Sequence, residues 1–121
     1  MNQSILTSVK KMLGMTEDYE PYDPVIIMHI NAVLMILNQL GVGPSEGFSI
    51  SDKTSTWSDF IADDKKLEAV KSYVYLKVKL LFDPPSSSIV MEAMSRMVNE
   101  LEWRLNAEVE SSGKEDTSQN G

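Results

Sequence analysis

The sequence feature that most constrains the fold is a pair of adjacent prolines, Pro84 and Pro85, between two long helical patterns. A proline pushes the residue before it out of helical geometry, and it lacks the amide hydrogen that a helix interior needs. The helical pattern over residues 65–82 must therefore end here. The serines at 86–88 can cap a second helix, so the sequence predicts two helices that meet at a fixed corner.

The apolar residues on either side of the prolines recur at helical spacing. Those before the prolines fall on two neighbouring stripes, and those after them fall on one. In the second helix, Glu92 lies four residues before Arg96, and Glu100 lies four before Arg104, and this spacing stabilises a helix. The apolar stripe of the second helix consists of Val90, Met94, Met97, Val98, Leu101 and Leu105.

Two further helices are predicted in the first third of the chain. Residues 3–13 repeat apolar residues at helical spacing, and Gly14 can end that helix. Asp23 and Pro24 favour a helix start, because aspartate caps free amide groups and proline at the first position loses no hydrogen bond. This helix should end at Leu40. It is apolar on more than one side, so we expect several packing neighbours, within the chain or between subunits.

Residues 41–56 interrupt the helical pattern with three glycines and a proline. Apolar and polar residues alternate in Phe48–Ser51, which would suit a short strand pair or an extended edge. Trp57 and Phe60 would suit one helical turn. Two adjacent aspartates then favour the start of the next helix, because acids stabilise its N-terminal end.

The last residues differ in composition from the rest. Residues 108–121 contain one large apolar residue, no aromatic residue, and four acids against one lysine. Such a segment cannot bury enough apolar surface to fold alone, so we expect a disordered tail after a last helix that ends near Ala107. The predicted fold is all-α: a bundle of about four main helices in residues 1–107, with an irregular middle segment, and a flexible acidic tail in residues 108–121.

The composition excludes several classes of function. The chain has 121 residues, a net charge of −7 and no cysteine, which removes disulfides, thiolate nucleophiles and cysteine-bound zinc. A chain this acidic is not expected to bind nucleic acid through general electrostatic attraction, because the phosphates are also negatively charged. A helix that spans a membrane needs about twenty apolar residues, and the longest apolar run, Val25–Leu37, is shorter than that. Because the first residues also lack the features of a signal peptide, we expect a soluble protein made inside the cell.

No pattern of catalytic or metal-binding residues stands out. His29 is the single histidine, and a lone histidine on an apolar helix is far more often structural than catalytic. The acids at 17, 18 and 20 lack the spacing and the glycine of a calcium loop, and the serines at 86–88 belong to no nucleophile or phosphate-binding motif. The sequence therefore predicts no catalytic residue, no cofactor and no metal.

Large apolar side chains outside the helical patterns are candidates for contact with a partner. Trp57 lies among serine, threonine and aspartate residues, where a tryptophan often marks a binding surface. The eight methionines favour core packing, with an adaptable protein-binding face as the alternative. Trp103 borders the last helix's stripe and would suit a core or an interface. The candidate contact residues are Phe48, Ile50, Trp57, Trp103, Glu108 and Glu110.

Two segments resemble a known family. Residues 75–86, Tyr-Leu-Lys-Val-Lys-Leu-Leu-Phe-Asp-Pro-Pro-Ser, and residues 100–105, Glu-Leu-Glu-Trp-Arg-Leu, are similar to the head–tail connector, or adaptor, proteins of long-tailed phages and prophages of Gram-positive bacteria. The apolar residues of the two N-terminal helices also resemble that family's opening helices. The resemblance covers residues 3–107, except that residues 41–56 carry no matching motif.

The resemblance implies a structural virion protein at the head–tail interface, made in the host cytoplasm. It implies a ring of about twelve copies that docks below the portal protein after genome packaging and extends the DNA channel. A tail-side stopper or head-closure protein would bind next, DNA would pass without specific binding, and no membrane would be involved. An acidic channel wall would suit this role because it does not retain DNA. The corner residues Phe82, Asp83, Pro84 and Pro85 would set the angle between the last two helices.

Two other interpretations remain open from the residues alone. A small helical DNA-packaging accessory or regulatory interaction module would need a basic face, and the sequence shows none. An enzyme subunit or cofactor-binding helical domain would need a group of convergent polar residues, which the sequence does not reveal.

Overall fold

The computed structural model describes residues 3–120, and the side chains of residues 3–107. Within these residues the chain forms helices and no strand, which confirms the predicted all-α fold. None of the described helices combines the length and the apolarity that crossing a membrane requires. The helices are α1 (Ile5–Met12), α2 (Asp23–Gln39), α3 (Trp57–Phe60), α4 (Asp64–Phe82) and α5 (Ser88–Asn120).

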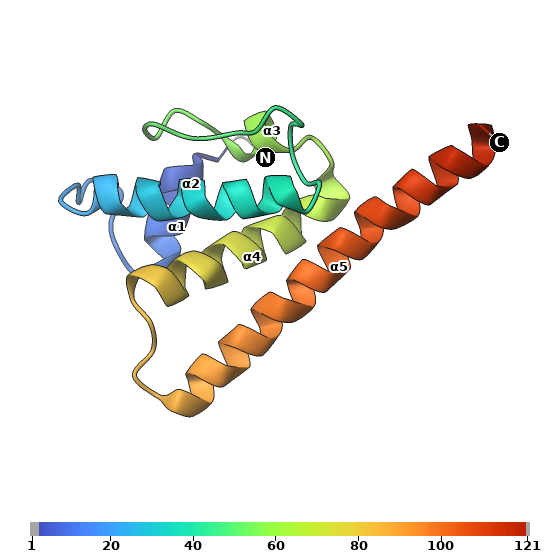
Figure 1. Cartoon of the computed structure of the whole chain (residues 1–121). Coiled ribbons are helices and arrows are strands. Elements are labelled where there is room, and N and C mark those ends of the chain that lie inside the picture. Colours follow the sequence, from blue (N-terminus) through green and yellow to red (C-terminus); the bar gives the residue numbers. More distant parts are fainter. Residues whose placement is uncertain (1–2, 121) are drawn as a thin grey trace.

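Helix α4 lies at the centre of the bundle. It packs between α2 and α5, and α1 packs against both α2 and α4 (Figure 1). Its side chains Val70, Tyr73, Val74 and Val78 are fully buried, and each such apolar side chain stabilises the fold by about 1.5–3 kcal/mol. The surrounding helices complete the core with Ile5, Leu6 and Val9 of α1, Ile26, Ile30, Val33, Leu34 and Leu37 of α2, and Val98 and Leu105 of α5.

Helices α1, α2 and α4 begin and end close to the predicted residues. Ser4 caps α1, because its hydroxyl accepts a hydrogen bond from the Thr7 amide at 3.2 Å. Asp63 caps α4 through a main-chain amide of the first turn. Helices α1 and α2 are each followed closely by a glycine with φ of 86°, Gly14 and Gly41. Residues with a side chain rarely adopt this conformation, so the two glycines end the helices.

A buried lysine ties α1 to the start of α2. The Nζ atom of Lys10 lies 2.9 Å from Asp23 Oδ1 and donates a hydrogen bond to the Glu17 carbonyl at 2.9 Å. A buried charge is tolerated only with such partners. Asp23 therefore does not cap α2 as predicted: α2 begins without a side-chain cap, and the carboxylate binds Lys10 instead.

The expected strand pair does not form, and the described part of the chain has only an isolated bridge between Ser4 and Thr56. The main chain of Ile50 pairs with a side chain of α2. Its amide donates to Asn31 Oδ1 at 2.8 Å, and its carbonyl accepts from Asn31 Nδ2 at 3.0 Å. One side-chain amide thus satisfies both polar groups that a neighbouring strand would have satisfied.

Helix α5 continues past the predicted end near Ala107 to Asn120, and Figure 1 shows it projecting beyond the other helices. The added segment has no proline, and its interior glycine, Gly113, costs a helix about 1 kcal/mol relative to alanine, so the local sequence permits the extension. A separate flexible tail in residues 108–121 stays a prediction.

We expect Asn31→Ala to lower the free energy of unfolding by about 1–2 kcal/mol, because both main-chain groups of Ile50 lose their partner. Alanine forms helices more readily than asparagine, so the change in helix propensity offsets part of this loss of stability. Urea unfolding followed by circular dichroism measures the change. Gln39→Ala, at an exposed position of the same helix, is the control and should leave stability nearly unchanged. Equal stability of N31A and the wild type would show that the pairing contributes nothing.

Candidate functional site

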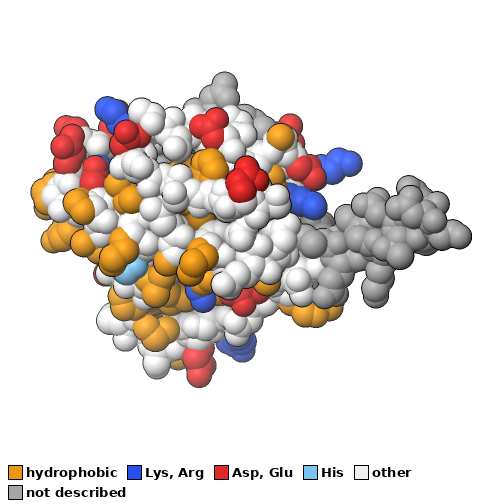
Figure 2. Space-filling model, turned by 45° about the horizontal axis from the view of Figure 1, so that its top comes forward, with side chains coloured by type: hydrophobic (Ala, Val, Ile, Leu, Met, Phe, Trp, Pro, Cys, Tyr) orange, Lys and Arg blue, Asp and Glu red, His pale blue; other side chains and the backbone are white. Residues whose placement is uncertain are grey.

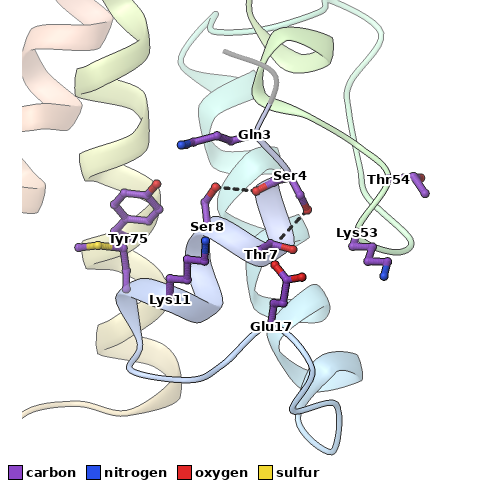
Figure 3. Close-up of a pocket in the computed structure, with 10 residues that line it drawn as sticks. Gln3, Ser4, Thr7, Ser8, Lys11, Glu17, Lys53, Thr54 and Tyr75 are labelled. Atoms are coloured by element: carbon purple, nitrogen blue, oxygen red, sulfur yellow. Dashed lines mark hydrogen bonds between the residues drawn. The ribbon is translucent and has the colours of Figure 1, made fainter.

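A hollow of about 640 Å³ lies beside α1 (Figure 3). Its wall carries Lys11, Lys53 and several hydroxyl groups, but no histidine that could activate a hydroxyl. The Ser8 hydroxyl donates to the Ser4 carbonyl at 2.6 Å and accepts from Trp57 Nε1 at 3.2 Å, so these groups hold the chain together. Nor does the described chain contain three His, Cys, Asp or Glu side chains placed to hold a metal. The described residues around the hollow therefore show no arrangement of side chains that points to catalysis or metal binding.

Two of the predicted contact residues are buried in the core of the protein. Trp57 is fully buried and packs edge-on against Tyr75, with ring centroids 6.1 Å apart, and Ile50 is also buried. The prediction that Trp57 is an exposed aromatic is therefore wrong. The contacts of the buried indole are distant in the sequence: Trp57 Nε1 donates a hydrogen bond to the Ser8 hydroxyl of α1, and the ring packs on Tyr75 of α4. Locally, Thr56 and Asp59 form a capping box that fixes the start of the short helix α3, and the Thr-x-x-Asp spacing was a sequence signal for that start.

The remaining predicted contacts have different outcomes. Phe48 is half-buried and packs against Phe60, with ring centroids 5.4 Å apart. Trp103 is 70% exposed, so its contact with a partner stays a proposal. The side chains of Glu108 and Glu110 lie outside the described residues.

The corner between α4 and α5 is anchored to α2. Phe82 packs edge-on against Tyr22 and His29, with ring centroids 5.4 and 6.3 Å apart. Asp83 ends α4 and accepts a hydrogen bond from Lys79 Nζ at 2.7 Å. His29 thus has a packing neighbour at the corner.

The outward side of α2 carries an uncovered apolar surface. Met28 and Met35 are 60% and 58% exposed, and Val25 and Ala32 are also exposed. These residues lie on the side of the helix opposite to the core residues, and no charged residue occurs between Pro24 and Gln39. Figure 2 shows apolar side chains gathered on the face that carries the single histidine. We call Val25, Met28, Ala32 and Met35 the α2 stripe.

A second uncovered apolar surface lies on the first half of α5. The predicted stripe of this helix is buried only at Val98 and Leu105, whereas Val90 is about half exposed and Met97 is 54% exposed. Arg96, although four residues after Glu92, forms no ion pair in the described chain, whereas Arg104 binds Glu100 at 2.7 Å. We call the uncovered or partly covered residues Val90, Met94, Met97 and Leu101 the α5 stripe.

Polar contacts of Glu102, near the middle of α5, hold this helix to α4. The hydroxyl of the fully buried Tyr73 donates to Glu102 Oε1 at 2.6 Å, and Lys77 Nζ lies 3.8 Å from the same oxygen. Burial raises the pKa of Tyr73 well above its ordinary value, and the hydrogen bond to Glu102 and that group's negative charge raise it further. The phenol therefore stays a hydrogen-bond donor into alkaline solution.

Comparison with known proteins gives one match. The model of the family described as phage connector protein matches residues 5–112, which is most of the chain. No curated protein and no solved structure matches the chain.

We expect Tyr73→Phe to destabilise the protein by about 1–2 kcal/mol at neutral pH, because a hydrogen bond to a carboxylate is lost. The difference should shrink above pH 10. A phenol whose pKa is raised by folding stabilises the wild type below its unfolded pKa near 10, and this contribution is lost as the pH rises further. Urea unfolding of both proteins between pH 7 and 11 tests this, and a difference independent of pH would contradict it.

We expect the double substitution of Pro84 and Pro85 by alanine to lower the melting temperature and to reduce assembly into particles. Alanine lets the backbone after Phe82 continue as a helix, so the corner is no longer fixed. Ser86→Ala, at an exposed position in the same connection, is the control, because it leaves Ser87 in place to accept the hydrogen bond of the Val90 amide at the start of α5. Unchanged melting and unchanged assembly in the proline variant would refute the role of the corner.

Proposed function

Because the chain belongs to the phage connector protein family, a family of structural proteins, we propose that it is a head-completion protein that joins the DNA-filled head to the tail. In this proposal it docks on the portal protein after genome packaging and presents its other end to a tail-side stopper or head-closure protein. It acts at the head–tail interface of the virion, without catalytic turnover.

The uncovered apolar surface carries this proposal. Met28, Met35 and Met97 are more than half exposed, and exposed apolar side chains that gather on one surface often mark a site of contact with another protein. Methionine side chains adapt to the shape of a partner, which suits a component that meets several proteins in turn. The exposed indole of Trp103 adds a large side chain of the kind that anchors interfaces.

A ring of about twelve copies is the form we propose for the assembled protein. Copies related by rotation need two different surfaces, one for each neighbour. The α2 stripe and the α5 stripe lie on different helices that flank α4, which meets this need.

The net charge of −7 supports a place around the DNA path. A wall of negative charge repels the phosphate backbone, so DNA can slide through without being held. In this proposal the protein extends the channel of the portal but does not read or grip the genome.

The decisive experiment is electron microscopy of particles from a phage or induced prophage that lacks this gene, with the gene restored from a plasmid as the control. We expect DNA-filled or leaking heads beside unattached tails, and normal particles after complementation. Normal infectious particles without the gene would overturn the proposal. Salt-sensitive DNA binding by the purified chain would then favour a DNA-packaging accessory.

A further inference from the structure

We propose that the hollow beside α1 is a docking site for an acidic peptide segment of another protein. The inference does not rest on the proposed function, because it follows from the side chains that line the hollow. It assigns to this surface the chemistry of its partner: carboxylates spaced along an extended chain.

Three segments of the chain build the hollow (Figure 3). Its floor is the outer side of α1, which presents three small hydroxyl side chains and a lysine: Ser4, Thr7, Ser8 and Lys11. Tyr75 of α4 stands on one side of this floor, and Lys53 and Thr54, in the loop before α3, stand on the other. Because most of the floor consists of small side chains, the main chain of a partner can come close to α1.

Hydrogen bonds join α1 to the loop and to α3, so these parts of the hollow are formed before a partner arrives. The Ser8 hydroxyl accepts a hydrogen bond from Trp57 Nε1 at 3.2 Å. The Ile5 amide donates to the Ser55 carbonyl at 3.0 Å. The Trp57 amide donates to the Gln3 carbonyl at 3.1 Å. A preformed site of this kind loses little conformational entropy when it binds.

The two lysines of the hollow favour an acidic partner. Lys11 and Lys53 are exposed, and neither forms an ion pair within the described chain, although the protein has 18 acidic residues against 11 basic ones. The carboxylate next to Lys53 is engaged elsewhere: Asp52 accepts hydrogen bonds from the amide and the hydroxyl of Thr54. Both ammonium groups can therefore bind carboxylates from outside the described chain.

One acid in the wall of the hollow restricts the kind of partner. Glu17 also lines the hollow, and its carbonyl accepts a hydrogen bond from Lys10 Nζ at 2.9 Å, which holds this part of the wall. Spaced carboxylates on a peptide can meet the two lysines and avoid Glu17. A DNA duplex carries one charge per about 1.7 Å of its axis, so it would bring phosphates against Glu17.

Fluorescence anisotropy with the purified full-length chain tests the docking site. The probe is a dye-labelled peptide in which glutamate and serine alternate, and the comparison peptide carries glutamine in place of glutamate. We expect the acidic peptide to bind, less tightly as salt is added, and the glutamine peptide not to bind. Equal binding of the two peptides, or no binding of the acidic one, would overturn the inference.

Substitutions place the peptide in the hollow. We expect Lys11→Glu and Lys53→Glu each to weaken binding by about fivefold or more, and Glu17→Gln to strengthen it. Lys65→Glu is the matched control, because it changes the net charge by the same amount at an exposed position outside the hollow. Circular dichroism checks that each variant is folded. If Lys65→Glu weakens binding as much as the other two reversals, the peptide responds to the overall charge and the inference is wrong.

Two further probes in the same assay test other occupants. A dye-labelled peptide of residues 108–121 should bind no more tightly than the glutamate–serine peptide. If it binds several times more tightly, the acidic end of this chain is the occupant and the commitment to another protein is wrong. A dye-labelled DNA duplex should not bind. If it binds and loses affinity in Lys11→Glu and Lys53→Glu, the hollow serves nucleic acid and the inference fails.

Discussion

The burial of α4 between α2 and α5 is the constraint on which the rest of the structure depends. Val70, Val74 and Val78 of α4 are fully buried in the core that this helix shares with its neighbours. The same burial takes Tyr73 out of water, so its hydroxyl needs a partner, and Glu102 of α5 supplies it at 2.6 Å. Apolar packing, which buries Val98 and Leu105 of α5, thus brings the helices together, and Glu102 adds polar contacts to Tyr73 and Lys77 of α4.

The packing of α2 and α5 against α4 leaves some of their apolar side chains exposed to water. Helices α2 and α5 each turn one side toward α4, and their other apolar side chains, Met28 and Met97 among them, face water. The polar side chains of Lys10 and Asn31 already bind partners within the chain: Lys10 forms an ion pair with Asp23, and Asn31 forms hydrogen bonds with the main chain of Ile50. Uncovered apolar stripes of this kind are surfaces that a binding partner often covers, which supports the proposed role in an assembly.

The predictions succeeded where they rested on local rules and failed where a distant contact decided. Pro84 and Pro85 end one helix before the next begins, and glycines follow α1 and α2, because these residues restrict their own backbone. The position of Trp57 depends instead on Ser8 and Tyr75, which lie far away in the sequence, and its polar neighbours suggested exposure. Likewise, the alternation in Phe48–Ser51 suggested a strand, but the partner of Ile50 proved to be a side chain of α2.

The sequence by itself determined the all-α class, the limits of most helices, the acidic character and the resemblance to the family that the match over residues 5–112 supports. These follow from residue types and short spacings, which act within a few positions of the chain. Only the tertiary structure decided which apolar residues lie inside. Helical periodicity shows that α2 and α5 have apolar sides, but it does not show which side meets α4. That choice buried Ile26 and Val98 and left Met28 and Met97 on the surface.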